Sequence, residues 1–139
     1  MPYDAKALAD AALAARAKAY CPYSGFAVGA ALAGENGEIY TGCNIENASY
    51  GVTNCAERTA LFTAVGRGAR RFAALAVAGA PAGQAPPLPP CPPCGVCRQA
   101  LLEFCPPEMP VLLVQAPGQY ETHTLGELLP LGFGPGALL

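Results

Sequence analysis

The chain has 139 residues, a length typical of one domain with a buried core, and residues 1–139 are expected to form that domain. Hydrophobic residues make up 53% of the chain and charged residues only 13%. So small a charged share predicts that apolar surface is buried between the subunits of a homo-oligomer. The formal net charge of −2, without a basic run, argues against nucleic acid and favours a small neutral partner.

The sequence contains no stretch that is long and apolar enough to cross a bilayer, so no membrane partner is expected. Its first residues lack the basic and apolar regions of a signal peptide, which favours a cytoplasmic protein. The seven cysteines are then expected to be reduced. Clustered cysteines are therefore interpreted as metal ligands before disulfides.

The first part of the chain is predicted to contain a helix followed by a pair of strands. Residues 4–19 carry apolar side chains near helical spacing, and Asp4 can cap that helix. An Asn-Gly pair indicates a hairpin turn between the two strands. The strand, turn, strand and following Asn- and Gly-rich loop are expected at 26–33, 35–38, 39–44 and 45–53.

The second part alternates helices and strands. A helix over 55–66 can be capped by Thr53 or Asn54, and a later helix should stop before Pro106. A buried strand, a proline-rich loop, that later helix, a second buried strand, an edge strand and a short helical turn are expected at 72–80, 81–93, 95–105, 111–115, 120–124 and 125–129. This order predicts an α/β fold with a mixed sheet covered by helices.

Two cysteine clusters lie where loops enter the predicted helices. Cys55 begins the first cluster, and Cys94 and Cys97 form the second. Backbone N–H groups at a helix start favour negative charge, so a cysteine there is readily a thiolate, the form that binds zinc. Cys94 and Cys97 can point to one side of a helical turn while Cys55 arrives from the other helix. The pattern predicts one Zn²⁺ per chain held by three thiolates.

A fourth zinc position left open is typical of a catalytic site rather than a structural one. Water bound there becomes a nucleophile near neutral pH. Glu57, two residues after Cys55, is placed to accept a proton from that water and pass it on. Three thiolates leave zinc with a net negative charge that opposes this ionisation. Arg58 is expected to donate hydrogen bonds to a thiolate and so withdraw charge from the metal.

The sequence resembles the small homo-oligomeric cytidine deaminases in blocks that follow one another over nearly the whole chain. Together these blocks are far more specific than any one of them. They are Phe26-Ala27-Val28-Gly29-Ala30-Ala31-Leu32, Gly42-Cys43-Asn44-Ile45-Glu46-Asn47-Ala48-Ser49-Tyr50-Gly51, Cys55-Ala56-Glu57-Arg58-Thr59-Ala60, Pro93-Cys94-Gly95-Val96-Cys97-Arg98-Gln99, and Leu128-Leu129-Pro130 before Phe133.

The resemblance implies a substrate pocket for a nucleoside. Asn44 and Glu46 correspond to the pair that holds the ribose hydroxyls, and Phe26 to the aromatic that packs against the pyrimidine. Ala56 would offer its backbone N–H to the carbonyl of the base. Taken without the resemblance, Asn44 and Glu46 are equally compatible with turn residues, and Phe26 with a core aromatic.

The resemblance also implies an architecture and an assembly. The family fold has three layers, with a five-stranded mixed sheet flanked by helices. Tyr50 and Phe133 correspond to residues that complete a neighbouring subunit's pocket, so the active form would be a tetramer with shared active sites. The reaction implied is hydrolytic deamination of cytidine and deoxycytidine to uridine and deoxyuridine, with release of ammonia, as in pyrimidine salvage.

Several alternatives stay open at this point. A lone C-x-x-C can be a redox pair or half of a structural zinc site, and Cys91 adds a nearby thiol that could displace a ligand. A non-catalytic zinc module would require a fourth protein ligand. Within the deaminases, another amino-heterocycle such as blasticidin S is the main competing substrate.

Overall fold

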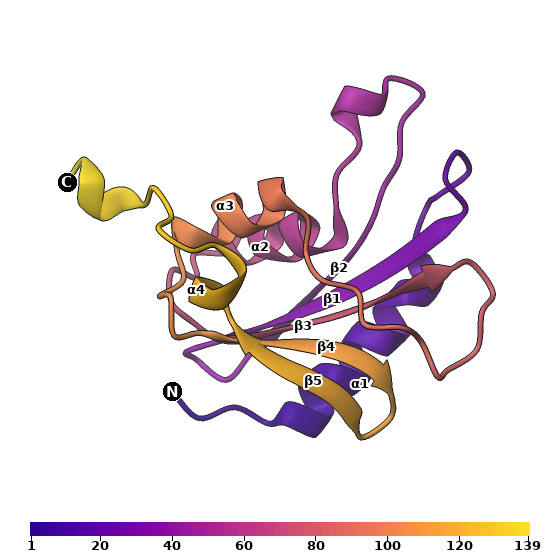
Figure 1. The fold of residues 1–139 in the computed structure, drawn as a ribbon, viewed down its shortest axis with the longest axis horizontal. Helices are drawn as coiled ribbons and strands as arrows, with labels where there is room; N and C mark the ends of the chain where they lie inside the picture. The colour runs from indigo at the N-terminus through magenta and orange to yellow at the C-terminus, as the bar shows by residue number, and fades with distance from the viewer.

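Five segments of the chain pair into one mixed sheet, in the order β2-β1-β3-β4-β5 (Figure 1). The computed structural model describes residues 1–139. The strands are β1 (Phe26–Gly34), β2 (Ile39–Cys43), β3 (Phe72–Pro81), β4 (Pro110–Ala116) and β5 (Gln119–Thr124). The helices are α1 (Ala5–Ala15), α2 (Ala56–Gly66), α3 (Gly95–Leu102) and α4 (Leu125–Leu128), with 3-10 turns at Arg16–Lys18, Tyr50–Val52 and Pro135–Ala137. None of the helices has the length and hydropathy that a bilayer span requires.

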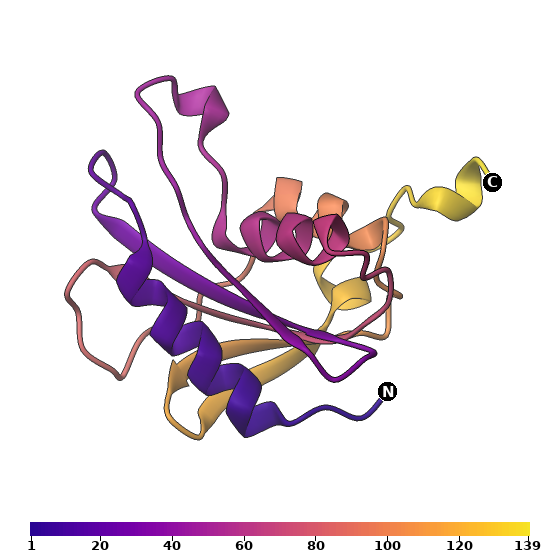
Figure 2. The ribbon, with the colours of Figure 1, turned by 180° about the vertical axis from the view of Figure 1, so that it is seen from behind.

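The directions of the strands show where the sheet requires a crossover connection, and helices cover both of its faces. The pair β3 and β4 is parallel, and the other neighbouring pairs are antiparallel. A parallel pair requires a crossover, which the 81–93 segment and α3 supply. Helix α1 lies on the face opposite α2 and α3 (Figure 2). The predicted α/β fold, with three layers and a five-stranded mixed sheet, is confirmed.

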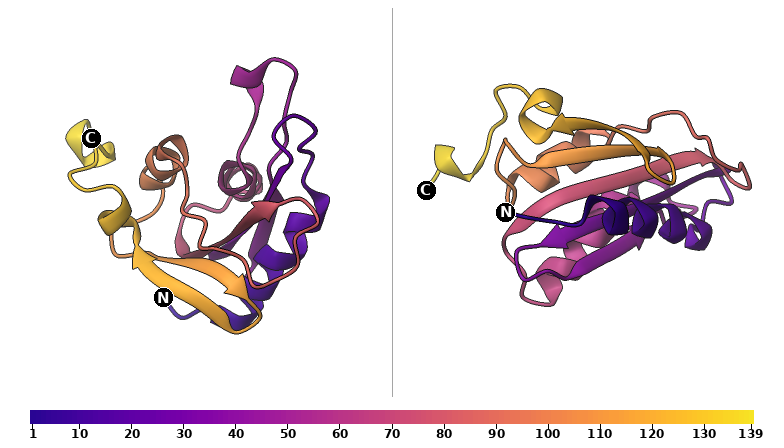
Figure 3. Two further views of the ribbon diagram at one scale, coloured as in Figure 1. Left: turned by 45° about the vertical axis from the view of Figure 1, so that its right-hand side comes forward. Right: turned by 90° about the horizontal axis from the view of Figure 1, so that it is seen from below.

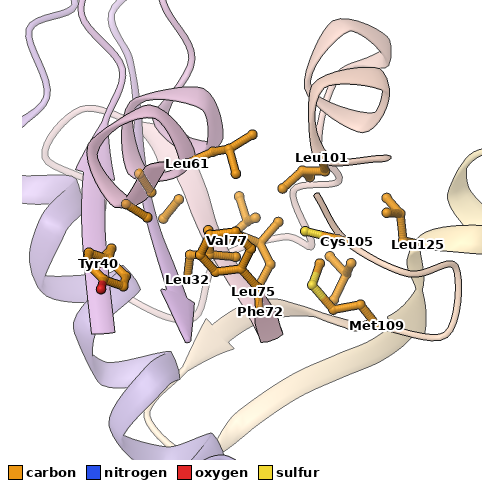
Figure 4. Packing of buried hydrophobic residues seen from close by; sticks show 14 of the residues in the cluster. Leu32, Tyr40, Leu61, Phe72, Leu75, Val77, Leu101, Cys105, Met109 and Leu125 are labelled. Atoms are coloured by element: carbon orange, nitrogen blue, oxygen red, sulfur yellow. The ribbon is translucent and has the colours of Figure 1, made fainter. Parts of the chain in front are cut away.

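The central strands read as continuous apolar runs because both of their faces are covered. In β3 every residue from Phe72 to Ala80 is buried, and β1 is almost as completely enclosed. The edge strand β5 is largely exposed, which fits its polar sequence. The layer beneath α2 and α3 contains the larger side chains, among them Leu61, Phe72 and Leu101 (Figure 4). The layer beneath α1 is mostly alanine, with Leu8 and Leu88 among its few larger members.

Two glycines in adjacent strands let the helices lie directly on the sheet. A Cβ on Gly29 would lie 2.2 Å from the Ala12 carbonyl oxygen of α1. A Cβ on Gly42 would lie 2.5 Å from the Ala60 nitrogen of α2, on the opposite face. Any side chain at these positions would push a helix away from the strands, because both contacts are with backbone atoms.

Three features of the helices differ from the sequence prediction. The predicted helix 4–19 ends at Ala15, and the chain continues as the 3-10 turn Arg16–Lys18. Helix α2 is capped by neither Thr53 nor Asn54, because Cys55 itself is the N-cap residue and makes no side-chain capping bond. The predicted helix 95–105 ends at Leu102, since the residue before Pro106 is restricted from helical conformation and the chain turns there. The remaining elements lie within a few residues of their predicted bounds.

Replacing Gly29 with alanine is expected to destabilise the fold by about 2–3 kcal/mol, because the added methyl group would overlap the backbone of α1. Gly66→Ala is the matched control, since Gly66 lies in α2 with open space around its Cα. Urea unfolding should separate the two variants. Equal free energies of unfolding would contradict the close approach of α1.

Candidate active site

The starts of α2 and α3 meet on one side of the sheet and bring three cysteines together. Cys55 and Cys94 are the N-cap residues of the two helices, and each has an extended backbone. Cys97 lies in the first turn of α3 and is fully buried. The three sulfurs lie within 4.8 Å of one another, and no other cysteine, histidine or carboxylate belongs to the cluster. The three residues predicted as ligands are therefore assembled, with no fourth side chain among them.

The cluster has the dimensions of a zinc site. The sulfurs of Cys55 and Cys94 are 3.7 Å apart. Zinc–sulfur bonds of about 2.3 Å in tetrahedral geometry place two sulfurs about 3.8 Å apart. Three soft sulfur donors at this spacing suit zinc, and three protein ligands leave one tetrahedral position for solvent or substrate. The residues present therefore fit the metal that the sequence predicts.

Arg58 contacts the cluster from the first turn of α2. Its Nη2 donates a hydrogen bond to the Cys55 sulfur at 3.3 Å, and its Nε is buried without a partner. Hydrogen bonds from Cys97 and Arg58 lower the pKa of Cys55 to about 5, which makes it a thiolate at neutral pH. Burial opposes the charge of Arg58, but hydrogen bonds to the Cys55 and Cys97 sulfurs more than offset this and raise its pKa. The predicted contact between Arg58 and a ligand sulfur is thus present.

Glu57 is one of only two buried polar residues in the chain, with 4% of its surface exposed. Burial raises the pKa of its carboxyl to about 7, and the negative charge of Cys55 adds to the increase. The carboxyl also lies within hydrogen-bonding reach of Cys97. A carboxyl with a pKa near neutrality, held beside a metal-binding cluster, can both accept and return a proton.

Cys91 lies outside the ligand cluster and packs against β3. A Cβ on Gly79 would lie 2.6 Å from the Cys91 sulfur and 3.2 Å from Cε1 of Phe26. Gly79 therefore makes room for two side chains at the end of the sheet nearest the cluster. Burial raises the pKa of the Cys91 thiol to about 11, and its sulfur is not among the three that cluster.

The predicted pocket residues Phe26, Asn44 and Glu46 are joined in one network. The Asn44 amide accepts from the Val28 nitrogen at 2.9 Å and donates to the Phe26 oxygen at 2.8 Å. Ser24 Oγ accepts from the Phe26 nitrogen at 3.0 Å and donates to the Glu46 carboxylate. Phe26 is 39% exposed, so it is not a core residue.

Glu46 also lines a cavity of about 320 Å³, together with Tyr50 and Thr53. The 44–54 segment that carries these three residues projects from the rest of the ribbon (Figure 3). The Glu46 carboxylate accepts hydrogen bonds from the backbone of Tyr23 and Ser24, and the Ser24 contacts lower its pKa. Tyr50 lies in the same cavity, where its ring meets the Tyr23 ring edge-on with centroids 5.6 Å apart. Tyr50 is 74% exposed, which leaves most of its ring uncovered in one chain.

The two other predicted pocket residues, Ala56 and Phe133, differ in burial. Ala56 is fully buried at the first position of α2, where its N–H has no acceptor within the helix. Phe133 belongs to the C-terminal tail, and its carbonyl accepts a bond from Gln99 of α3 at 2.8 Å. Phe133 is 63% exposed in one chain.

Some residues that hold the site together were not singled out from the sequence. Tyr23 and Ser24 lie in a turn that sequence patterns mark only as a link between elements. Arg98 follows a ligand and donates to the carbonyls of Pro93 and Leu128, which ties the metal loop to α4. A larger cavity, of about 680 Å³, lies beneath the C-terminal tail and contains none of the predicted site residues.

Comparisons with known proteins agree with this geometry. The family model for the cytidine and deoxycytidylate deaminase zinc-binding region matches residues 2–113. The chain is 51% identical over 119 residues to a cytidine deaminase from Sporosarcina psychrophila, spanning 86% of this chain and 83% of the relative. It is 48% identical over 130 residues to a cytidine deaminase from Halalkalibacterium halodurans, spanning 94% of each.

Solved structures support the same assignment. The crystal structure of cytidine deaminase from Burkholderia pseudomallei is similar to this chain with a TM-score of 0.83 at 49% identity. The likeness covers 94% of this chain and 99% of that one, so it includes the whole sheet and not only the cysteine cluster. The chain therefore belongs to the cytidine deaminase family.

Proposed function

We propose that the chain, acting as one deaminase domain over residues 1–139, converts cytidine and deoxycytidine to uridine and deoxyuridine. Water supplies the new oxygen at C4 of the ring, and ammonia leaves. The observation that carries the proposal is a cluster of three cysteine sulfurs without a fourth side chain, beside the buried carboxyl of Glu57. Family membership and the cavity lined by Ser24, Glu46 and Tyr50 support the same substrate class.

The role proposed for Glu57 is to move protons between solvent, the ring and the leaving group. Zinc, when bound by the three cysteines, supplies a solvent molecule acidic enough to act at neutral pH. Glu57 in its ionised form takes a proton from the attacking water and delivers it to N3. It then takes the second proton of that water, from the new hydroxyl at C4, and delivers it to the departing amine, so that C4 keeps the oxygen as a carbonyl. A carboxyl whose pKa burial raises to about 7 is suited to both directions of transfer.

Arg58 is proposed to adjust the charge of the cluster. Its guanidinium holds the Cys55 sulfur at 3.3 Å and adds a positive charge beside three thiolates. Without that charge the cluster would bind the metal with a net negative charge and resist ionisation of solvent. The contact therefore favours turnover more than it favours metal retention.

The remaining predicted residues are proposed to hold the nucleoside. Phe26 packs its exposed face against the pyrimidine, and the Ala56 N–H donates to the base carbonyl. Asn44 and Glu46 bind the ribose hydroxyls through the hydrogen-bonding capacity that their backbone contacts leave free. The network that joins Phe26, Asn44 and Glu46 supports this arrangement, because it fixes the ring and the sugar-binding groups relative to each other.

We further propose that the active form is a tetramer in the cytoplasm, in which Tyr50 and Phe133 complete a neighbour's pocket. Both rings are largely uncovered in one chain. The projecting 44–54 segment also exposes the apolar side chains of Ile45 and Val52, which burial against a second subunit would remove from water. A reducing compartment keeps the three ligand sulfurs available for zinc.

Glu57→Gln should retain zinc and lower kcat for cytidine by about 10²- to 10⁴-fold, because the amide fills the space but cannot transfer protons. Ultraviolet assay of cytidine turnover measures the loss. Glu38→Gln, in the exposed β1–β2 turn, is the matched control and should behave like the parent. Near-parental turnover in Glu57→Gln would remove the residue from the proposed role.

Cys55→Ala should lose most of its zinc, because only two of the three ligand sulfurs remain and two thiolates hold the ion weakly. Metal analysis of the purified protein after dialysis gives the zinc content per chain. Cys21→Ser serves as the control, since Cys21 lies in the 20–25 turn outside the cluster. One zinc per chain in Cys55→Ala would contradict the three-sulfur site.

Arg58→Gln should keep zinc but lower kcat by about tenfold or more, because the Cys55 thiolate loses its cationic donor. Arg67→Gln, at the exposed end of the same helix, is the control. The comparison requires zinc content and kcat on the same preparations. A parental rate with full zinc in Arg58→Gln would refute the charge argument.

Sedimentation at micromolar concentration should give a mass about four times the 14.2 kDa of the chain. Tyr50→Ala should lower activity even where the tetramer persists, because the neighbour's pocket lacks a ring. The control is Tyr120→Ala, on the edge strand β5. A fully active monomer would exclude shared sites.

A further inference from the structure

Arg16 joins three segments of the chain at one end of the sheet. It begins the 3-10 turn that follows α1, and its guanidinium contacts only backbone carbonyls. Nε donates to the Ala27 oxygen at 3.0 Å, and Nη2 donates to the oxygens of Pro81 at 2.9 Å and Ala80 at 3.4 Å. Nη1 donates to the Gln84 oxygen at 3.2 Å. All three nitrogens of the planar group are therefore used.

The four acceptors lie on the backbone around Phe26, the residue proposed to pack against the pyrimidine. Ala27 directly follows Phe26 in β1, and in the sheet register Phe26 lies opposite Pro81. Gln84 belongs to the 81–93 segment, which leads from β3 to the ligand Cys94. One side chain thus fixes the backbone that carries the pocket aromatic and the beginning of the metal loop.

Three different side chains bond the backbone of Phe26 and of the residue after it. Asn44 and Ser24 bond its carbonyl and its nitrogen, and Arg16 bonds the next carbonyl along the strand. The position of Arg16 is itself constrained, because a Cβ on Gly29 would lie only 2.4 Å from the Arg16 nitrogen. The helix end therefore cannot move without moving these contacts.

Arg16 makes no ion pair with a carboxylate, so its charge is directed wholly at carbonyl oxygens. Hydrogen bonds from a charged donor are stronger than neutral ones, and the rigid fork of arginine fixes their directions. Lysine carries the same charge on a single nitrogen and cannot reproduce bonds from three separate nitrogens.

We propose that Arg16 is a positioning residue for nucleoside binding, which acts by holding Phe26 and the start of the 81–93 segment at their places in the pocket wall. The inference rests on the proposed contact between Phe26 and the pyrimidine. Arg16 does not touch the substrate, and the metal ligands are held by other contacts. Its loss therefore acts on substrate binding and leaves the metal in place.

The test compares Arg16→Lys with Arg70→Lys. Arg70 also donates only to backbone carbonyls, those of Val65 and Ala69, but it lies at the far end of α2 from Cys55. Zinc content, thermal midpoint, kcat and KM for cytidine are measured for both variants.

We expect Arg16→Lys to raise KM at least about fivefold, with full zinc and kcat within about twofold of the parent. Arg70→Lys should leave KM unchanged. A lowered thermal midpoint with parental KM in Arg16→Lys would make its role merely structural and overturn the inference.

A double-mutant cycle with Phe26→Ala separates the inference from the function on which it rests. If Arg16 acts through Phe26, Arg16→Lys should have little further effect on KM in the Phe26→Ala background. Full additivity, with KM raised in each single variant, would overturn the inference and leave the pyrimidine contact intact. An unchanged KM in Phe26→Ala alone would refute the proposed pyrimidine contact, and the inference would fall with it.

Discussion

The rest of the site depends on one constraint, which is that three sulfurs are held close together. Each of them must be negative to bind a metal. Like charges at this spacing repel, so the fold has to supply compensation before the metal arrives. The N-termini of α2 and α3 point at Cys55 and Cys94, and Arg58 donates to the Cys55 sulfur. The same helix start buries Glu57 and raises the pKa of its carboxyl. The proposed ligand, counter-charge and proton carrier thus come from one turn of helix, which explains why they lie so close in sequence.

Small residues in the strands also fix the helices relative to β1, the strand that carries the proposed pyrimidine contact. Gly29 and Gly42 allow α1 and α2 to lie on opposite faces of adjacent strands, so both helix ends are fixed relative to β1. Asn44 and Arg16 hold two successive carbonyls of β1, those of Phe26 and Ala27. Binding groups that are positioned by backbone contacts need not be ordered when substrate arrives, which lowers the entropic cost of binding.

The sequence alone was sufficient for the metal cluster and for the order of the elements. Cysteine spacing, the apolar run of β3 and the Asn-Gly turn each depend on local chemistry, and the structure contains all three. The capping residue of α2 was predicted wrongly, because Cys55 occupies the cap position that a polar neighbour would ordinarily take. Contacts between distant segments had no local signal. Arg16 with Ala80, and Ser24 with Glu46, become neighbours only when the sheet forms.

The most direct measurement is a titration of metal-free protein with zinc, in which cytidine turnover is followed by ultraviolet absorbance. The account predicts no turnover after chelation, a rise in proportion to added zinc, and a plateau at one zinc per chain. Turnover that persists without zinc, or protein that binds one zinc per chain and leaves cytidine unchanged, would contradict it.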